Sequence, residues 1–292
     1  MSRTPDKRFR AALVQLRSGR SVEANLDKAE ALIRRAAQGG AAYVQTPENT
    51  ALMELEPALT LKAAQSEEKS AALKRFSDLA AELGIYLHIG SLSIRLDETR
   101  AANRSYLIDP AGAIVARYDK LHMFDVDLPG GESHRESGYC RPGARAVVAE
   151  LPFGRLGLSI CYDLRFPQLY RALAMAGAEF IAVPAAFTRQ TGEAHWHVLM
   201  RARAIETGTF MLAATQGGLH ESGRATFGHS LIVSPWGEIL AEGGEEPGVV
   251  FADIDLAASA EARARIPALK HGRAFEVEIV APVAESARKE AS

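Results

Sequence analysis

The sequence has few cysteines and no excess of charge of either sign. Only Cys140 and Cys161 occur in 292 residues, too few for a disulfide framework or for a zinc site without histidine, and typical of the reducing cytoplasm. The 34 Lys and Arg nearly balance 36 Asp and Glu, for a formal net charge of −2. This balance lacks the electrostatic footprint of a protein that binds nucleic acid or an anionic membrane.

Long apolar runs and phosphate-binding loops are missing as well. No stretch approaches the roughly 18 uninterrupted apolar residues of a membrane span, and no signal-peptide run follows the basic N-terminus. Neither the glycine fingerprint of dinucleotide sites nor the P-loop spacing occurs. Because 47% of the residues are hydrophobic, we expect a globular cytoplasmic protein, either an enzyme or an enzyme-like scaffold.

Patterns typical of strands and helices alternate along the chain. We expect strands at residues 9–16, 42–44, 85–94, 103–108, 114–118, 147–151, 156–161, 180–183, 210–215 and 249–254, and a hairpin from 228–234 and 238–241. We expect helices at residues 22–38, 66–83, 167–176 and 194–207. Without a linker or composition break, this predicts one layered α/β domain over residues 1–292, with a core at about 9–255 and an interface arm or tail at 256–292.

Some motifs suggest chemistry but favour a structural interpretation. His195 and His197 lie two positions apart on an expected helix, so their side chains point to nearly opposite sides and no metal site is predicted. Ser159 lies inside a strand, in an incomplete Gly-x-Ser-x-Gly motif. Cys140 lies in a loop without an activating neighbour.

Residues suited to catalysis follow the ends of three different strands. Cys161 lies between a strand and a helix start, where backbone N–H groups can lower a thiol pKa and bind an oxyanion. Glu48 follows the strand at 42–44, and Lys120 follows the strand at 114–118. Alone, each is more often a core cysteine or a surface charge. Together they place a base, a cation and a thiol at strand ends, where open α/β sheets carry their sites.

The stretches around these residues resemble the three signatures of the nitrilase superfamily of carbon–nitrogen hydrolases. They are Pro47-Glu48, Tyr118-Asp119-Lys120-Leu121-His122 and Ile160-Cys161-Tyr162-Asp163-Leu164-Arg165-Phe166-Pro167. The similarity extends over roughly residues 9–255 in the family's order and spacing. It implies a four-layer αββα sandwich of nitrilase type with mixed sheets, and a homodimer or a larger even-numbered homo-oligomer.

The resemblance also implies roles for individual residues. Members of the superfamily use a Glu-Lys-Cys triad, which corresponds here to Glu48, Lys120 and Cys161. A further catalytic glutamate is usual between the Lys and the Cys; Glu136 matches it better than Glu132. The backbone N–H of Tyr162 is implied as an oxyanion donor. No metal and no organic cofactor is implied.

Other stretches are most similar to the deaminated glutathione amidase branch, with omega-amidases as the nearest relatives. They are residues 125–131, 186–188 with 191–192, and 201–207. The branch implies hydrolysis of a small, carboxylate-bearing aliphatic amide through a cysteine thioester. Phe187, Thr188 and Arg189 are candidates for substrate contacts.

The substrate carboxylate requires a cation, for which Arg165, Arg189 and Arg201 are the candidates. For Arg165, in the cysteine signature, a structural role is favoured, and for Arg189, expected in a loop, the two roles are even. The alternatives to an activity of the deaminated glutathione amidase type are an omega-amidase or an aliphatic nitrilase. The alternatives that are not hydrolases are an N-acyltransferase and a non-catalytic binding scaffold. The intact Glu48, Lys120 and Cys161 argue against the scaffold.

Overall fold

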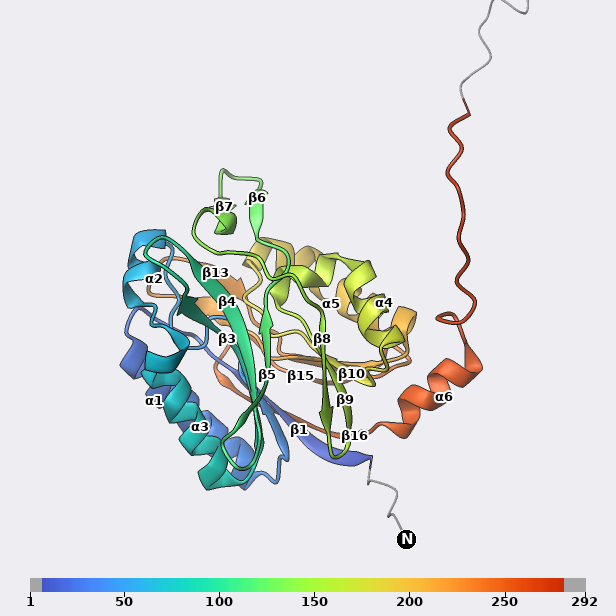
Figure 1. Ribbon diagram of the computed structural model, residues 1–292, viewed down its shortest axis with the longest axis horizontal. Coiled ribbons are helices and arrows are strands. Elements are labelled where there is room, and N and C mark those ends of the chain that lie inside the picture. The colour runs from blue at the N-terminus through green and yellow to red at the C-terminus, as the bar shows by residue number, and fades with distance from the viewer. Residues whose placement is uncertain (1–6, 281–292) are drawn as a thin grey trace, which may run out of the picture.

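The computed structural model describes residues 7–280 of the chain. Two six-stranded sheets face each other, and helices cover the outer face of each sheet (Figure 1). The fold is therefore the four-layer αββα sandwich that the resemblance implied. Within the described residues, no helix is both long enough and apolar enough to span a membrane.

The first sheet pairs a strand from the N-terminal part of the chain with one from the C-terminal part. Its strands are β1 (Arg8–Gln15), β2 (Tyr43–Gln45), β3 (Tyr86–Arg95), β4 (Ala101–Ile108), β5 (Ile114–Asp119) and β16 (Gly248–Asp255). They lie in the order β16-β1-β2-β3-β4-β5. β2 is parallel to β1 and β3, whereas β16 runs antiparallel to β1, from Arg8 opposite Asp255 to Gln15 opposite Gly248.

The second sheet repeats this mixed pattern. Its strands are β8 (Val147–Leu151), β9 (Gly154–Leu158), β10 (Phe180–Ala182), β11 (Phe210–Ala213), β14 (Leu231–Val233) and β15 (Ile239–Glu242). They lie in the order β15-β14-β11-β10-β9-β8, with β9, β10 and β11 parallel. Two hairpins stand apart from the large sheets: β6 (Asp125–Asp127) with β7 (Ser133–Arg135), and β12 (Gly217–Leu219) with β13 (Ala225–Phe227).

Capping residues set where several helices begin. The α-helices are α1 (Val22–Gln38), α2 (Pro57–Ala63), α3 (Ala71–Leu83), α4 (Pro167–Met175), α5 (Arg189–Thr207) and α6 (Ala257–Arg265). The 3-10 helices are η1 (Glu67–Lys69), η2 (Glu136–Gly138) and η3 (Cys161–Arg165). Ser21, Ser70 and Thr188 each accept a hydrogen bond from a backbone N–H of the first turn of α1, α3 and α5.

Alternation along β1 creates two hydrophobic layers. Ala11 and Leu13 are buried between the two sheets, whereas Ala12 and Val14 are buried beneath α1 and α3. Between the sheets, the ring of Phe9 stacks on Phe153 with centroids 4.1 Å apart. β2, which leads to Glu48, is likewise buried along its whole length, whereas β5, which leads to Lys120, is partly exposed.

The structure corrects three of the expected elements. The helix expected at 66–83 is divided, because Ser70 adopts an extended conformation and caps α3. The helix expected at 194–207 begins at Arg189, because Thr188 caps it, so Arg189 lies in a helix and not in a loop. The strand expected to reach Cys161 ends at Leu158, and Cys161 begins a 3-10 helix.

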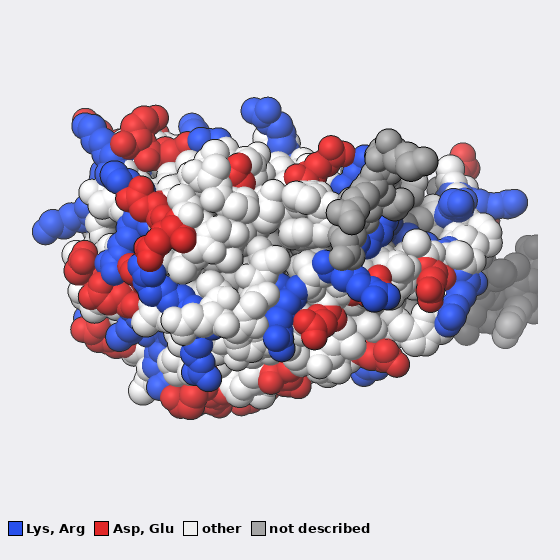
Figure 2. Space-filling view, turned by 90° about the horizontal axis from the view of Figure 1, so that it is seen from below, with Lys and Arg blue, Asp and Glu red and all other residues white. Residues whose placement is uncertain are grey.

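The C-terminal segment leaves the body of the molecule after α6 (Figure 1). Residues 270–280 are all exposed to solvent. They include the apolar residues Phe275, Val277 and Ile279, which are 85%, 80% and 91% exposed. The expected interface arm at 256–292 extends further, and its residues 281–292 lie outside the described part of the chain. On the face shown in Figure 2, acidic and basic side chains are interleaved.

Candidate active site

A pocket of about 880 Å³ opens where β2, β5 and β9 end. Glu48, Lys120 and Cys161 all line it, so residues that are far apart in the sequence share one cavity. The backbone of β3 touches the segment that carries Glu48, because a Cβ atom at Gly90 would lie 2.2 Å from the Thr46 carbonyl oxygen. Only glycine allows this close approach, which fixes the segment before Glu48.

Lys120 contacts two carboxylates at the base of the pocket. Its Nζ lies 2.8 Å from Glu48 Oε1 and 2.8 Å from Glu136 Oε2. The side chains of Lys120, Glu48 and Glu136 are 2%, 4% and 10% exposed. Glu136 also accepts a hydrogen bond from the backbone N–H of Phe124 at 2.7 Å. The glutamate chosen from the sequence therefore lies beside the lysine.

Asn103 on β4 belongs to the same cluster, although the sequence analysis did not identify it. Its Nδ2 donates to Glu48 Oε1 at 2.9 Å and to Glu136 Oε1 at 3.0 Å. One amide group thus joins the two carboxylates, and it shares Glu48 Oε1 with Lys120 Nζ. A lone asparagine in a strand has no sequence signal that would have indicated this contact.

Cys161 lies in a constrained turn between β9 and α4. Its φ of 48° is in the left-handed region, which is uncommon for a residue other than glycine. Its backbone N–H donates to the Pro184 carbonyl at 2.9 Å. The thiol donates a hydrogen bond to the Glu48 carboxylate. The turn therefore directs the thiol at the base that the sequence assigned to it.

Asp163 anchors this turn to the segment that carries Lys120. Its Oδ2 accepts from the Tyr118 hydroxyl at 2.7 Å and from the Ile160 N–H at 2.9 Å. Its Oδ1 lies 2.7 Å from His122 Nδ1. Asp163 is completely buried. It therefore fixes the two chain segments relative to each other, a role that the sequence analysis missed.

Burial and charge set the protonation states of the cluster. Burial opposes ionisation of Glu48, but the charge and hydrogen bond of Lys120 hold the pKa of the Glu48 carboxyl below its usual value. Burial also opposes the charge on Lys120, yet Glu136 and Glu48 raise the pKa of its ammonium well above the usual value. At neutral pH, Glu48 is a carboxylate and Lys120 is an ammonium ion.

Burial, reinforced by the negative charge of Glu48, raises the pKa of the Cys161 thiol well above its usual value. The expectation that backbone N–H groups at this turn lower the thiol pKa is therefore wrong, because burial and a neighbouring carboxylate outweigh them. The resting site holds a neutral thiol beside a carboxylate. Cys140 is also buried, and burial raises its pKa to about 12, consistent with an inert cysteine.

The remaining candidate residues differ in their access to the pocket. Tyr162, Phe187, Arg189 and Glu132 line it, and Glu132 pairs with His134 at 2.8 Å. Thr188 is buried and its hydroxyl is bonded to Thr191, so it serves as the cap of α5 and does not line the pocket.

The three candidate arginines differ in the groups that they contact. Arg189 forms an ion pair with Glu245 at 2.9 Å, and Arg201 donates to the Gly237 carbonyl away from the pocket. Arg165 lines the pocket, with its guanidinium over the Phe187 ring at 5.4 Å. Within residues 7–280, no carboxylate pairs with Arg165. Its placement favours a substrate contact over the structural role that the sequence suggested.

Arg224 is a further pocket cation, which the sequence analysis missed. It lies between β12 and β13, and its Nη2 donates to the Ala186 carbonyl at 2.8 Å. Its Nε is buried and has no hydrogen-bond partner among the described residues. Arg165 and Arg224 together make the pocket suitable for an anionic ligand.

The chain is similar to known proteins over most of its length. Residues 10–264 match the model of the carbon–nitrogen hydrolase family. The chain is 39% identical over 270 residues to the deaminated glutathione amidase of Yersinia enterocolitica. The aligned residues make up 91% of this chain and 94% of the amidase.

Two solved structures are also similar to the chain. The C. elegans NitFhit protein has a TM-score of 0.85 at 35% identity, over 91% of this chain and 65% of that one. An amidase of Nesterenkonia sp. AN1 has a TM-score of 0.75 at 28% identity, over 89% of this chain and 95% of that one. Its structure shows covalent addition of the acetamide moiety of fluoroacetamide at the active site cysteine.

Proposed function

The chain belongs to the carbon–nitrogen hydrolase family and hydrolyses a carbon–nitrogen bond of a small amide, and we propose that its substrate is deaminated glutathione and its nucleophile Cys161. One observation carries the assignment of the nucleophile. The Glu48 carboxylate contacts both the Cys161 thiol and the Lys120 ammonium at the base of the pocket.

The first step is attack on the amide carbonyl. Because the thiol is neutral at rest, a proton must leave as the sulfur attacks, and the hydrogen-bonded Glu48 carboxylate takes it. A new S–C bond forms, and the electron pair of the carbonyl moves to its oxygen. Lys120 Nζ and the Tyr162 backbone N–H then stabilise the oxyanion.

The second step breaks the C–N bond. Glu48 returns its proton to the leaving nitrogen, so the amine departs neutral and a thioester remains on Cys161. Glu48, again a carboxylate, takes a proton from water, whose oxygen attacks the thioester. Collapse of this intermediate breaks the C–S bond and releases the acid, and Glu48 passes its proton to the sulfur, which restores the thiol and the carboxylate. Each proton is held by a residue of the pocket or by water.

Glu136 and Asn103 position these groups. Lys120 lies between Glu48 and Glu136, and Asn103 bridges the same carboxylates. Two constraints on each carboxylate limit its rotation, so the base stays beside the thiol. Glu136 is therefore proposed as part of the catalytic group, with a role in orientation.

The pocket cations support a carboxylate-bearing substrate. Arg165 has no carboxylate partner in the described chain, and Arg224 reaches the pocket from the β12–β13 hairpin. A guanidinium binds a carboxylate with two parallel hydrogen bonds. Phe187, beneath Arg165, provides the adjoining apolar surface, while Arg189 is proposed only for the rim because Glu245 already pairs with it.

Steady-state kinetics on a substrate panel test this proposal. Deaminated glutathione, alpha-ketoglutaramate, an uncharged aliphatic amide and an aliphatic nitrile are compared, with Cys161→Ala as the inactive control. We expect the highest kcat/KM for deaminated glutathione. A higher value for alpha-ketoglutaramate identifies an omega-amidase, and a higher value for the uncharged amide or nitrile rejects the carboxylate requirement. Product analysis with an added amine distinguishes hydrolysis from acyl transfer.

We further propose that the chain is a single domain that assembles as a homodimer, or as a larger even-numbered oligomer, in the cytoplasm. Two apolar features support assembly: the exposed Met175 at the end of α4 and the exposed Phe275, Val277 and Ile279 of the C-terminal segment. Both cysteines are free, as in cytoplasmic proteins. Light scattering is expected to give at least twice the chain mass of 31.5 kDa; a monomer at micromolar concentration would contradict the dimer.

A further inference from the structure

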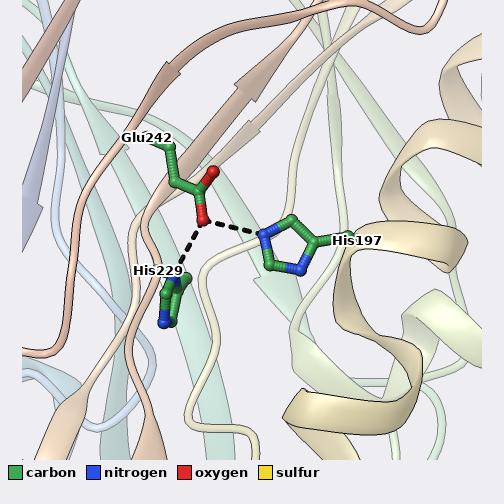
Figure 3. Close-up of side chains that lie close together, drawn as sticks. All are labelled: His197, His229 and Glu242. Atoms are coloured by element: carbon green, nitrogen blue, oxygen red, sulfur yellow. Dashed lines mark hydrogen bonds and ion pairs between the residues drawn. The ribbon is translucent and has the colours of Figure 1, made fainter.

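A second cluster of titratable side chains lies outside the pocket, where α5 approaches the end of β15. His197 on α5, His229 before β14 and Glu242 on β15 point toward one another (Figure 3). Glu242 Oε1 lies 2.8 Å from His197 Nε2 and 2.7 Å from His229 Nδ1. The ligand atoms of the three residues all lie within 4.8 Å of one another.

This geometry is close to that of three ligands around one ion. Zinc binds imidazole nitrogen and carboxylate oxygen at about 2.0–2.2 Å, so tetrahedral ligand atoms lie roughly 3.3 Å apart. Each imidazole nitrogen would have to move by about half an ångström from the Glu242 oxygen, and the two imidazole nitrogens, which lie within 4.8 Å of each other, would have to take up the same separation. The side chains of His197, His229 and Glu242 are 34%, 28% and 31% exposed, so an ion can enter from solvent and keep a water as fourth ligand.

The surrounding structure holds both rings in place. His229 has a φ of 56°, an uncommon conformation for a non-glycine residue. Its N–H donates to the Gly244 carbonyl and its carbonyl accepts from Trp196 Nε1, each at 2.9 Å. Phe227 stacks on the His229 ring at 4.2 Å and meets the edge of the His197 ring at 5.9 Å. The ligands are thus largely positioned before any ion binds.

We propose that His197, His229 and Glu242 form a binding site for a borderline divalent cation, with Zn²⁺ as the best match. Two imidazoles and one carboxylate suit zinc, whereas Mg²⁺ and Ca²⁺ prefer oxygen ligands alone. His195 does not contribute, because its ring lies 3.3 Å from the Arg165 guanidinium. The sequence argument against the His195 and His197 pair therefore holds, but His197 has other partners from distant segments.

The ion would connect α5, which lines the pocket with its first turn, to two segments of the second sheet region. The first turn of α5, with Arg189, Gln190 and Thr191, lines the pocket. Phe227 packs against the same helix, because a Cβ atom at Gly192 would lie 2.2 Å from Phe227 Cβ. An ion at the cluster joins α5, the segment before β14 and β15. Its main effect is therefore on stability, and the chemical step does not use it.

Zinc titration of the full chain tests the site. Because the Cys161 thiol and its neighbouring carboxylates are also zinc ligands, all measurements use a Cys161→Ala background. The chelator-treated protein is titrated with ZnCl2 by calorimetry, and its thermal unfolding is followed with and without ZnCl2. We expect one zinc per chain and a higher Tm with zinc, whereas MgCl2 at the same concentration leaves the Tm unchanged.

Substitutions at the cluster separate this site from other zinc ligands. His197→Gln, His229→Asn and Glu242→Gln are each expected to weaken zinc binding by at least about tenfold and to remove the rise in Tm. Asparagine is chosen at position 229 because it tolerates the left-handed conformation. His195→Gln, two positions away on the same helix, should bind zinc like the parent. Absence of saturable binding, or parental affinity in the three cluster variants, overturns the proposal, and neither result bears on the proposed hydrolysis.

Discussion

Two groups of ion pairs in this molecule differ in burial, although each has two carboxylates for every cation. The pocket cluster consists of Lys120, Glu48, Glu136 and Asn103, and its single cation faces two carboxylates in nearly complete burial. The helix-face cluster lies on α1 and α3, where Arg34 and Arg75 face four carboxylates, those of Glu23, Asp27, Glu30 and Glu82. The Glu82 side chain there is 58% exposed.

This difference indicates what each group contributes. Exposed ion pairs contribute little to stability, because water screens them and their side chains lose entropy. Buried pairs are costly to desolvate and are therefore weak evidence for stability. The excess negative charge of the pocket cluster instead keeps Lys120 protonated and the Cys161 thiol neutral. The pocket cluster is thus explained by chemistry and the helix-face cluster by helix packing.

The largest expected effect comes from removing the thiol beside the pocket cluster. Cys161→Ala should reduce kcat by at least about 10⁴-fold, because no other group can form the thioester. The fold should persist, because one small side chain is lost at the start of the short 3-10 helix η3. Activity assays and circular dichroism check both statements. Cys140→Ser, also in the pocket lining, should keep kcat within a few-fold, and a similar loss in both variants would reject the assignment.

Neutralising the second carboxylate of the pocket cluster should have the next largest effect. Glu136→Gln is expected to lower kcat by about 10²-fold or more, because Lys120 and Asn103 lose a charged partner and the geometry loosens. Glu132→Gln removes the same charge from the exposed β6–β7 hairpin, and its kcat should change by less than about threefold. Equal small effects would show that Glu136 does not belong to the catalytic group.

Removing one cation from each cluster compares their stabilities directly. Lys120→Met leaves two buried carboxylates without their counter-charge and should cost roughly 3 kcal/mol of unfolding free energy. Arg75→Met removes a partly exposed arginine from the helix face and should cost about 1 kcal/mol or less, with kcat unchanged. Urea unfolding measures both variants. Equal losses would remove the distinction between the clusters.

The arginines of the pocket provide a smaller effect on binding. Arg165→Gln should raise KM for deaminated glutathione by about tenfold, because a guanidinium–carboxylate contact is lost, and should leave KM for an uncharged amide unchanged. Arg189→Gln, whose arginine pairs with Glu245, should change KM by about twofold or less. Equal effects of Arg165→Gln on both substrates would indicate a structural role.

The smallest predicted effect is the pH dependence of stability. The pKa of Glu48 is lowered in the fold, so its ionised form stabilises the protein above its usual pKa of 4.5, and this contribution is lost as the pH falls through the folded value. The pKa of Lys120 is raised above 10.5, so its contribution is complete below that pH and is lost only as the pH rises through the folded value. The pair therefore stabilises the fold throughout the neutral range.

Glu48→Gln isolates the acidic limb of this dependence. The difference in unfolding free energy between parent and variant should be constant at neutral pH and should shrink below about pH 4.5, where the parent carboxylate takes up a proton. Urea unfolding between about pH 3 and 7 measures the difference. A difference that stays constant throughout this range would show that the Glu48 pKa is not lowered by the fold.

Local sequence signals determined most of the elements and supplied the candidates for the reactive residues. Hydrophobic periodicity and capping residues predicted α4, the β14–β15 hairpin and most strands, because these signals depend on neighbouring residues. Errors arose where one side chain decided a boundary, as at Ser70 and Thr188. Glu48, Lys120, Glu136 and Cys161 were identified because each lies in a recognisable short motif.

Tertiary structure alone decided which side chains meet. No local pattern places β16 beside β1, Asn103 between two glutamates, or His197 beside Glu242, because each contact joins segments far apart in the chain. The same is true of protonation: the raised pKa of Cys161 depends on burial and on Glu48, not on its place in a turn. The sequence specified which chemical groups this protein has, and the packing of the two sheets decided their distances, charges and exposure to water.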